Sequence, residues 1–139
     1  MPNQATITQT LKACGLRITP QRYAVYTNLL GRCDHPTAEQ ILQDLNQDAP
    51  TSSQATVYSS LQALRDVGLV REVRLDAGIC RYDANMAPHH HFQCQSCGHI
   101  EDVPWAHFDV VQQQPLRDGL SLGSYEVIIQ GTCCDHCKA

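Results

Sequence analysis

Two Cys-x-x-Cys pairs constrain the fold of this chain more than any other feature. CQSC occupies residues 94–97 and CDHC occupies residues 134–137, with 36 residues between them. Both sulfurs of such a turn can face one ion, and four thiolates are the donor set of a tetrahedral structural zinc site. A shared ion would fasten the end of the chain to residues 94–97 and so stabilise a domain with a small core. The expected Zn²⁺ ligands are Cys94, Cys97, Cys134 and Cys137.

Cys133 leaves an alternative open at the second pair. It directly precedes Cys134, and either could be the ligand, although only Cys134 makes the two-residue spacing with Cys137. All of these cysteines could instead be ordinary thiols. Eight cysteines in a chain without an export leader fit a reducing cytoplasm, where disulfide frameworks are rare. With no apolar run near the ~18 residues that span a bilayer, we expect a cytoplasmic protein and no membrane contact.

The stretch HHHFQC, residues 89–94, supplies a second set of metal donors. In a strand, the side chains of His89 and His91 lie on one face and that of His90 on the other. Two imidazoles joined by carboxylates make a site suited to Fe(II), Mn(II) or Zn(II). The candidate carboxylates are those of Asp83, Glu101 and Asp102. A lone histidine such as His35 is more often structural than a ligand.

The N-terminal half carries the start signals of several helices. Thr19 followed by Pro20 starts one helix, and Thr37 with Gln40 forms a capping box that starts another. A longer helix follows in SSQATVYSSLQALRDVGLV, where apolar residues recur at helical spacing.

The next segment, VREVRLDAGICRYD, is typical of two short strands joined by a turn. Three arginines are expected to line this hairpin: Arg71, Arg74 and Arg81. Helices followed by a basic hairpin are the element order of a winged helix.

The charge distribution and the polar face of the longer helix favour DNA binding by this half. Residues 1–82 hold eight Lys/Arg against seven Asp/Glu, whereas residues 83–139 hold two against seven. Contacts with phosphate are therefore expected in the first half. The outer face of the helix is uncharged and able to hydrogen-bond, as a helix in a major groove requires. The pattern equally fits amphipathic helices of a small domain whose arginines are only solvated.

In the second half, GSYEVIIQG at residues 123–131 alternates in a way that suits a strand buried on both faces, as in a subunit interface. WAHFDVVQQQ at residues 105–114 predicts a poor helix that ends before Pro115. Neither pattern establishes a dimer.

Several motifs together resemble the ferric uptake regulator superfamily, in the order that the family uses and over nearly the whole chain. They are RITPQR (17–22), HPTAEQI (35–41), ATVYSSLQALRDVGLV (55–70), RYD ending at Asp83, HHHFQCQSCG (89–98) and the final CxxC. That family consists of homodimeric, metal-dependent repressors. The resemblance implies an α+β fold with an N-terminal winged helix-turn-helix domain (1–82), a hinge (83–89) and a small C-terminal α/β dimerisation domain (90–139).

Carried over by position, the resemblance also implies the roles of individual residues. The structural zinc falls on the four cysteines named above, although the family commonly has Gly-x-Cys where this chain has a one-residue insertion after Gly131. The regulatory metal falls on His35, Asp83, His89, His91 and Asp102. Asp83 stands where zinc sensors commonly have cysteine. Asp102 stands where uptake regulators usually have glutamate, which favours the peroxide-sensing branch, whereas a shift to Glu101 would restore a glutamate. Tyr125 matches a histidine of a further site in iron-uptake members.

The implied function is a repressor and not an enzyme. Fe²⁺ or Mn²⁺ would close the hinge and fix the homodimer on a palindromic DNA operator, and hydrogen peroxide would inactivate the iron form by oxidising His35 or His89. The expected DNA contacts are Gln54, Tyr58 and Ser59 to bases, with Arg17 and Arg22 to phosphates or a minor groove. An iron- or zinc-uptake regulator is the alternative. A zinc hydrolase is more distant, because HExxH and the deaminase motif are absent. A thiol oxidoreductase is also more distant, because the CxxC pairs lack the βαβ pattern of that fold.

Overall fold

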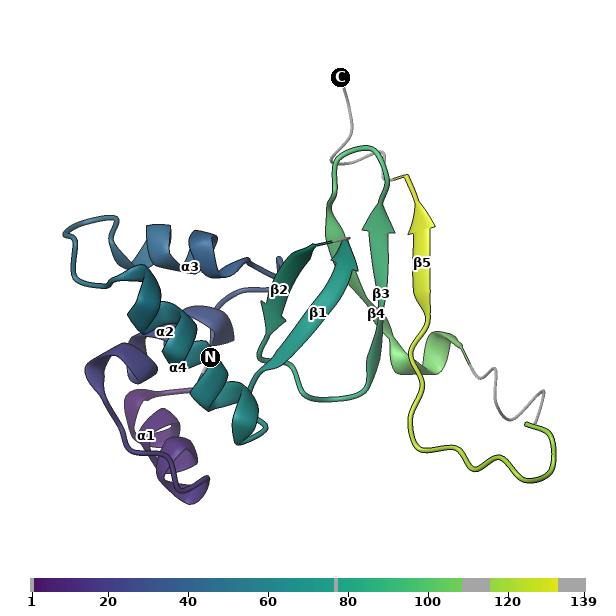
Figure 1. The fold of residues 1–139 in the computed structure, drawn as a ribbon, viewed down its shortest axis with the longest axis horizontal. Helices are drawn as coiled ribbons and strands as arrows, with labels where there is room; N and C mark the ends of the chain where they lie inside the picture. The colour runs from purple at the N-terminus through teal and green to yellow at the C-terminus, as the bar shows by residue number, and fades with distance from the viewer. Residues whose placement is uncertain (1, 77, 109–115, 133–139) are drawn as a thin grey trace. The chain divides into compact units, whose positions relative to one another are not determined.

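A computed structural model describes residues 2–76, 78–108 and 116–132 (Figure 1). The chain forms two compact units, Met1–Met86 and Ala87–Ala139. The division falls inside the predicted hinge of residues 83–89. The expected zinc ligands of the second CxxC pair, together with Cys133, lie outside the described residues.

The first unit contains four helices, whose starts follow from local capping. They are α1 (Gln4–Ala13), α2 (Pro20–Leu30), α3 (Ala38–Leu45) and α4 (Gln54–Asp66). The side chain before each helix accepts a backbone N–H from its first turn; these caps are Asn3, Thr19, Thr37 and Ser53. Thr37 and Gln40 form the predicted capping box. Each such cap contributes on the order of 1 kcal/mol to the stability of its helix.

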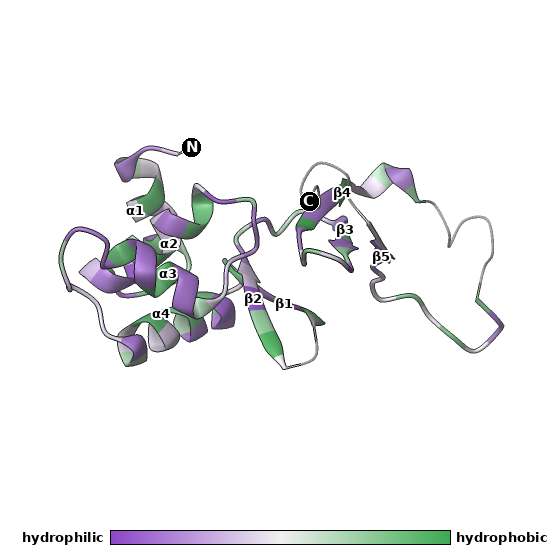
Figure 2. Cartoon of the chain, turned by 90° about the horizontal axis from the view of Figure 1, so that it is seen from above, coloured by the Kyte–Doolittle hydropathy of each residue, from purple (hydrophilic) through white to green (hydrophobic). Residues whose placement is uncertain are grey.

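Apolar residues from all four helices form the core of this unit. Figure 2 shows hydrophobic and hydrophilic residues interspersed along the helices, as amphipathic helices require. On α4, the side chains of Val57, Leu61 and Leu64 are buried. Full burial of a side chain of this size contributes roughly 1.5–3 kcal/mol. Because these buried side chains fix the orientation of α4, its opposite face points to solvent.

A β-hairpin completes the first unit. Strands β1 (Arg71–Asp76) and β2 (Ile79–Asp83) pair antiparallel, with Arg71 opposite Asp83. Gly78 at the turn has a φ of 78°, a conformation that glycine adopts without steric penalty. The predicted winged-helix fold is confirmed.

The second unit is a three-stranded sheet with β3 (His89–Cys94) at its centre. Strand β4 (Ile100–Pro104) pairs antiparallel with β3, and β5 (Ile128–Gly131) pairs parallel on its other side. A parallel partner requires a long crossover, which residues 105–127 supply. The helix predicted for residues 105–114 is seen only as the 3₁₀ turn η1 (Trp105–His107), because residues 109–115 lie outside the described ranges.

The expected burial of the last strand on both faces, as in a subunit interface, stays a prediction, because it concerns two chains. Strand β5 is the edge of the sheet, and the side chain of Ile128 is 47% exposed. Within the described residues, Leu116, Leu120 and Leu122 are also about half exposed. Large apolar side chains left exposed in this number are typical of a unit that has an interaction surface.

Candidate metal centre

The first unit brings two of the predicted metal donors together. The Nε2 atom of His35 lies 3.5 Å from Oδ2 of Asp83, at the end of β2. Both side chains are buried, with exposed fractions of 1% and 9%. A buried imidazole facing a buried carboxylate is a pair of ligand atoms already removed from water, which suits metal binding.

His35 adopts a backbone conformation that a side-chain-bearing residue rarely occupies. Its φ is 54°, in the left-handed region, where a residue other than glycine is strained by about 1–2 kcal/mol. Strand β2 holds this segment in place. The Arg81 guanidinium donates to the His35 carbonyl at 3.2 Å, and the N–H of Tyr82 donates to the Pro36 carbonyl at 2.9 Å. The strained conformation directs the imidazole inward toward Asp83.

Asp83 has further partners on both of its oxygens. Nε of Arg71, its cross-strand neighbour, lies 3.9 Å from Oδ2, and the N–H of Asn85 donates to Oδ1 at 2.8 Å. These contacts orient the carboxylate and balance its charge inside the protein. The structure therefore does not favour Arg71 and Arg81 as part of a basic outer lining of the hairpin, because both guanidinium groups contact the His35 and Asp83 segments.

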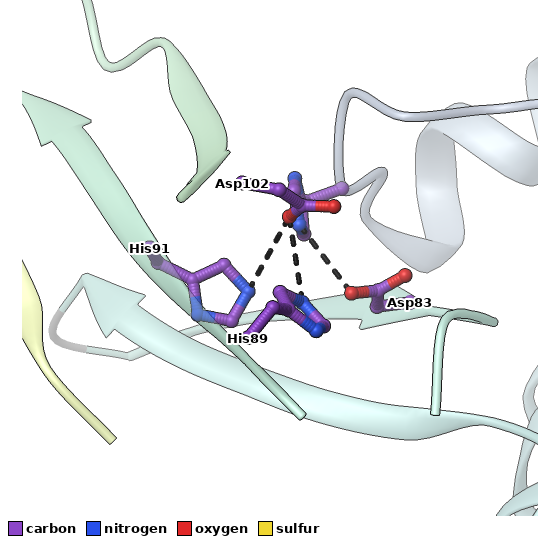
Figure 3. A group of neighbouring side chains, drawn as sticks. Asp83, His89, His91 and Asp102 are labelled. Atoms are coloured by element: carbon purple, nitrogen blue, oxygen red, sulfur yellow. Dashed lines mark ion pairs between the residues drawn. The ribbon is translucent and has the colours of Figure 1, made fainter. Parts of the chain in front are cut away.

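The second unit brings the other three predicted donors together. His89 and His91 lie on the same face of β3, and Asp102 comes from β4 (Figure 3). Oδ1 of Asp102 is 3.4 Å from Nε2 of His89 and 3.7 Å from Nε2 of His91. One ligand atom from each of the three residues lies within 4.8 Å of the others. Two imidazoles and one carboxylate in this arrangement fit a nitrogen and oxygen site for a divalent metal.

Each of these imidazoles has an oxygen at its second nitrogen. Nδ1 of His89 is 2.6 Å from the Ala87 carbonyl, and Nδ1 of His91 contacts the carboxylate of Glu126. A carbonyl or carboxylate oxygen accepts, so Nδ1 is the donor; in the neutral imidazole this leaves the lone pair on Nε2. The Nε2 lone pairs are the ones that face Asp102.

The sheet register separates the two candidate carboxylates of β4. Asp102 lies opposite His91 and shares its face, whereas Glu101 lies opposite Phe92 and projects to the other face. Glu101 contacts Nε2 of His99 at 3.3 Å and is 67% exposed. The structure therefore brings Asp102, and not Glu101, to the two histidines.

His90 occupies the opposite face of β3, as predicted from the alternation of strand side chains. Its ring is fully buried and stacks on Trp105 with 4.7 Å between ring centroids. Its Nδ1 accepts the N–H of Val127 at 2.9 Å. Tyr125 lies 5.9 Å away, so this side of the sheet is an aromatic cluster and not a second set of ligands among the described residues.

The first half of the predicted zinc site has a compact turn. Cys94 ends β3 and is 1% exposed, and the N–H of Cys97 points at its Sγ from 3.5 Å. The N–H of Gly98 donates to the Cys94 carbonyl at 2.9 Å, and its φ of 77° lets the chain fold back beneath the sulfurs. A tight turn of this kind is typical of a CxxC pair, and the zinc site itself stays a prediction.

The predicted DNA-contact residues of α4 share its outer face. Gln54, Tyr58 and Ser59 are all exposed. Arg17 is exposed, whereas the Arg22 guanidinium donates to the Arg17 carbonyl at 2.8 Å. Arg22 therefore shapes the loop that presents Arg17, in addition to any contact with phosphate.

A groove of about 330 Å³ borders Tyr58, with Ile79 and Tyr82 of β2 on its other wall. Burial, followed by a hydrogen bond with Cys80, raises the pKa of Tyr82. Tyr82 therefore stays neutral to a higher pH than an exposed tyrosine does. At the hairpin, burial tends to raise the pKa of Glu72, but hydrogen bonds from Arg74 and Arg65 lower it.

The partners that hold the ligands were not predicted from the sequence. The sequence pattern predicts that Arg71 and Arg81 line the hairpin, and it indicates no role for Glu126 in a metal site. The contact between Arg71 and Asp83 could have been predicted, because the two residues lie opposite each other in the hairpin. The contact of Glu126 with His91 depends on the parallel register of β3 and β5, for which the sequence has no signal.

Comparisons with known proteins identify the family. The Ferric uptake regulator family matches residues 13–130. The peroxide-responsive repressor PerR of Staphylococcus epidermidis is 36% identical over 130 residues, which cover 92% of this chain and 85% of the relative. The peroxide operon regulator of Bacillus subtilis is 36% identical over 126 residues, covering 90% and 87%.

The fold agrees with this assignment. The crystal structure of the Vibrio cholerae ferric uptake regulator superposes with a TM-score of 0.73 at 25% identity, and the match covers 90% of this chain and 98% of that one. The family match extends from the end of α1 into β5, and thus includes all five predicted regulatory ligands. This chain belongs to the ferric uptake regulator family.

Proposed function

We propose that this protein is a metal-dependent transcriptional repressor that hydrogen peroxide inactivates. One observation carries the proposal: metal donors cluster in both units. The buried His35 and Asp83 lie together in the first, and the buried His89 and His91 lie beside the 36%-exposed Asp102 in the second. The similarity to two peroxide-responsive regulators supports it. The hydrolase and oxidoreductase alternatives are set aside, since the family consists of transcriptional regulators.

Under this proposal, one regulatory ion takes ligands from both units. Three imidazoles and two carboxylates suit Fe²⁺ or Mn²⁺, which prefer nitrogen and oxygen over thiolate donors. An ion coordinated by ligands of both units binds only when the two ligand sets are together. Metal binding therefore shifts the population toward that arrangement of the units. The DNA-binding helices of a homodimer would then have the spacing of a palindromic operator.

Fe²⁺ held by these five residues would supply redox chemistry toward hydrogen peroxide. In the balanced reaction, one imidazole loses two electrons, one peroxide oxygen ends on a ring carbon and the other leaves as water. His35 and His89 are the proposed targets. Their burial keeps bulk water and other reductants away, and the Ala87 carbonyl fixes the orientation of the His89 ring. An oxidised imidazole is a poorer donor, so the two ligand sets separate and the repressor leaves the DNA.

The remaining parts of the proposal follow from the family. A structural Zn²⁺ on Cys94, Cys97, Cys134 and Cys137 would hold the second unit together, with Cys133 as the alternative to Cys134. The exposed apolar side chains of the second unit would be covered by the second subunit. None of the helices in the described ranges has the length and apolar character needed to cross a bilayer. The proposed site of action is the cytoplasm.

Operator binding before and after peroxide tests the function directly. We expect tight binding with either Fe²⁺ or Mn²⁺, and loss of binding after peroxide only with Fe²⁺. Mass spectrometry of the iron form should find a gain of one oxygen atom on the peptide that contains His35 or His89. Equal insensitivity of both metal forms would contradict peroxide sensing and would instead support a metal-uptake regulator.

Replacement of Tyr58 by alanine tests the DNA-contact face. Tyr58 is 44% exposed on α4 and lies outside the hydrophobic core of the first unit. We expect Tyr58→Ala to weaken operator binding by roughly 5- to 150-fold, which corresponds to the 1–3 kcal/mol of one base contact. Fluorescence anisotropy with operator DNA and with unrelated DNA measures this. An equal loss on both DNAs would assign Tyr58 to the phosphate backbone and contradict base reading.

A further inference from the structure

The two metal-facing histidines of β3 differ in what holds their second ring nitrogen. Nδ1 of His89 meets a neutral backbone carbonyl, that of Ala87, at 2.6 Å. Nδ1 of His91 meets an anionic side chain, the carboxylate of Glu126. The His91 ring is fully buried, whereas the Glu126 side chain is 36% exposed. The charge beside His91 is therefore stabilised partly by water and partly by the imidazole itself.

The segment that carries Glu126 also holds the backbone of His91. The N–H of His91 donates to the Val127 carbonyl at 3.2 Å, and His91 pairs with Ile128 in the parallel register of β3 and β5. Three consecutive residues thus contact His91, through both its main chain and its ring. With the backbone fixed at Val127 and Nδ1 fixed at Glu126, the imidazole has one orientation.

Glu126 is placed to support the ligand and not to be one. In an imidazole ring, Nδ1 and Nε2 point in divergent directions. Glu126 lies at Nδ1, whereas Asp102 Oδ1 lies 3.7 Å from Nε2. An ion at Nε2 is therefore separated from the Glu126 carboxylate by the width of the ring.

We propose that Glu126 is a positioning residue that makes His91 a stronger imidazole donor to the regulatory metal than His89 is. This inference rests on the proposed function. A carboxylate that accepts the Nδ1 proton fixes the tautomer and increases the electron density at Nε2, more than the neutral carbonyl of Ala87 does for His89. The metal is thereby held more firmly by the second unit, through a residue outside the predicted ligand set.

The test compares Mn²⁺ binding by Glu126→Ala and Glu126→Gln with that of the zinc-loaded, full-length wild-type protein. Loss of an outer-shell partner typically weakens metal binding by about 10- to 100-fold. We expect a loss in that range for Glu126→Ala. A smaller loss is expected for Glu126→Gln, because the amide oxygen still accepts the Nδ1 proton but carries no charge. The ¹⁵N shifts of the His91 ring should report a mixed tautomer in the alanine variant and the wild-type tautomer in the glutamine variant.

Glu101→Gln is the matched control. It removes the same charge from the same sheet, but Glu101 contacts His99 on the opposite face. We expect its Mn²⁺ affinity to equal that of the wild type. Zinc content and unfolding temperature, measured for every variant, identify any general loss of structure, and Glu126→Gln preserves the size of the side chain.

Unchanged Mn²⁺ affinity in both Glu126 variants would overturn the inference, as would an equal loss in Glu101→Gln. A failure of the function itself has a different signature. If His91→Ala binds Mn²⁺ as tightly as the wild type, His91 is not a ligand and the proposed site is wrong. If His91→Ala loses the metal but the Glu126 variants do not, the site stands and only the role of Glu126 is rejected.

Discussion

His35→Ala is expected to abolish metal-dependent operator binding while the protein keeps its structural zinc. His35 and Asp83 are the donors that the first unit contributes to the proposed regulatory site, and both are buried. Without His35, the ion loses one of the two ligands that the DNA-binding unit contributes. A metal that no longer favours one arrangement of the units cannot shift their population. We expect Mn²⁺ to leave the operator affinity of His35→Ala unchanged, whereas it should raise that of the wild type by roughly 5- to 150-fold.

The backbone of His35 requires a matched variant. At a φ of 54°, alanine is strained, so His35→Ala changes both the ligand and the local conformation. Asparagine tolerates this region, and His35→Asn therefore separates the two effects. Fluorescence anisotropy with operator DNA, with and without Mn²⁺, measures binding, and metal analysis measures zinc. Metal-dependent binding that persists in both variants would remove His35 from the sensor.

Cys94→Ser is expected to release the structural zinc and unfold the second unit. The Cys94 side chain is 1% exposed at the end of the central strand, so serine leaves an unpaired hydroxyl as well as an incomplete metal site. Structural zinc contributes about 10–16 kcal/mol of apparent binding free energy in small domains, more than such a core can replace. Zinc per chain should fall from one to near zero, and the dimer and all operator binding should be lost.

Cys33→Ser is the control for this variant, because Cys33 is exposed in the first unit and outside both CxxC pairs. It should retain zinc, four protected thiols and the wild-type unfolding temperature. Zinc analysis, thiol titration and thermal unfolding provide the measurements. A Cys94→Ser protein that holds one zinc per chain and unfolds as the wild type does would rule out the four-cysteine zinc site.

The parts of the fold that could be predicted from the sequence are those set by neighbouring residues. The caps at Thr19 and Thr37 and the faces of β3 depend on contacts within a few positions, so their patterns are visible in one sequence. The choice between Glu101 and Asp102 depends on a single residue of register between β3 and β4. Only the folded pairing separates them.

Other features of the site depend on residues far apart in the chain. From its sequence context alone, His35 is more typical of a structural histidine than of a ligand. Its left-handed backbone and its contact with Asp83 could not be predicted, because both require the hairpin to fold against residues 35–37. The role of Glu126 depends on a parallel pairing after a long crossover. The resemblance to the family implied a role for His35 but none for Glu126.

The parallel pairing of β3 with β5 has a consequence for communication between the two proposed metals. Cys94 pairs with Gly131, and three residues earlier His91 pairs with Ile128. Because strand side chains alternate with a period of two, a slip of β5 by a single residue would turn Glu126 away from His91. A zinc ion that fastens the chain beyond Gly131 to Cys94 would prevent this slip. The structural zinc would therefore act on the regulatory metal in a second way, by fixing the alignment of β5 with β3 as well as by stabilising the fold of the second unit.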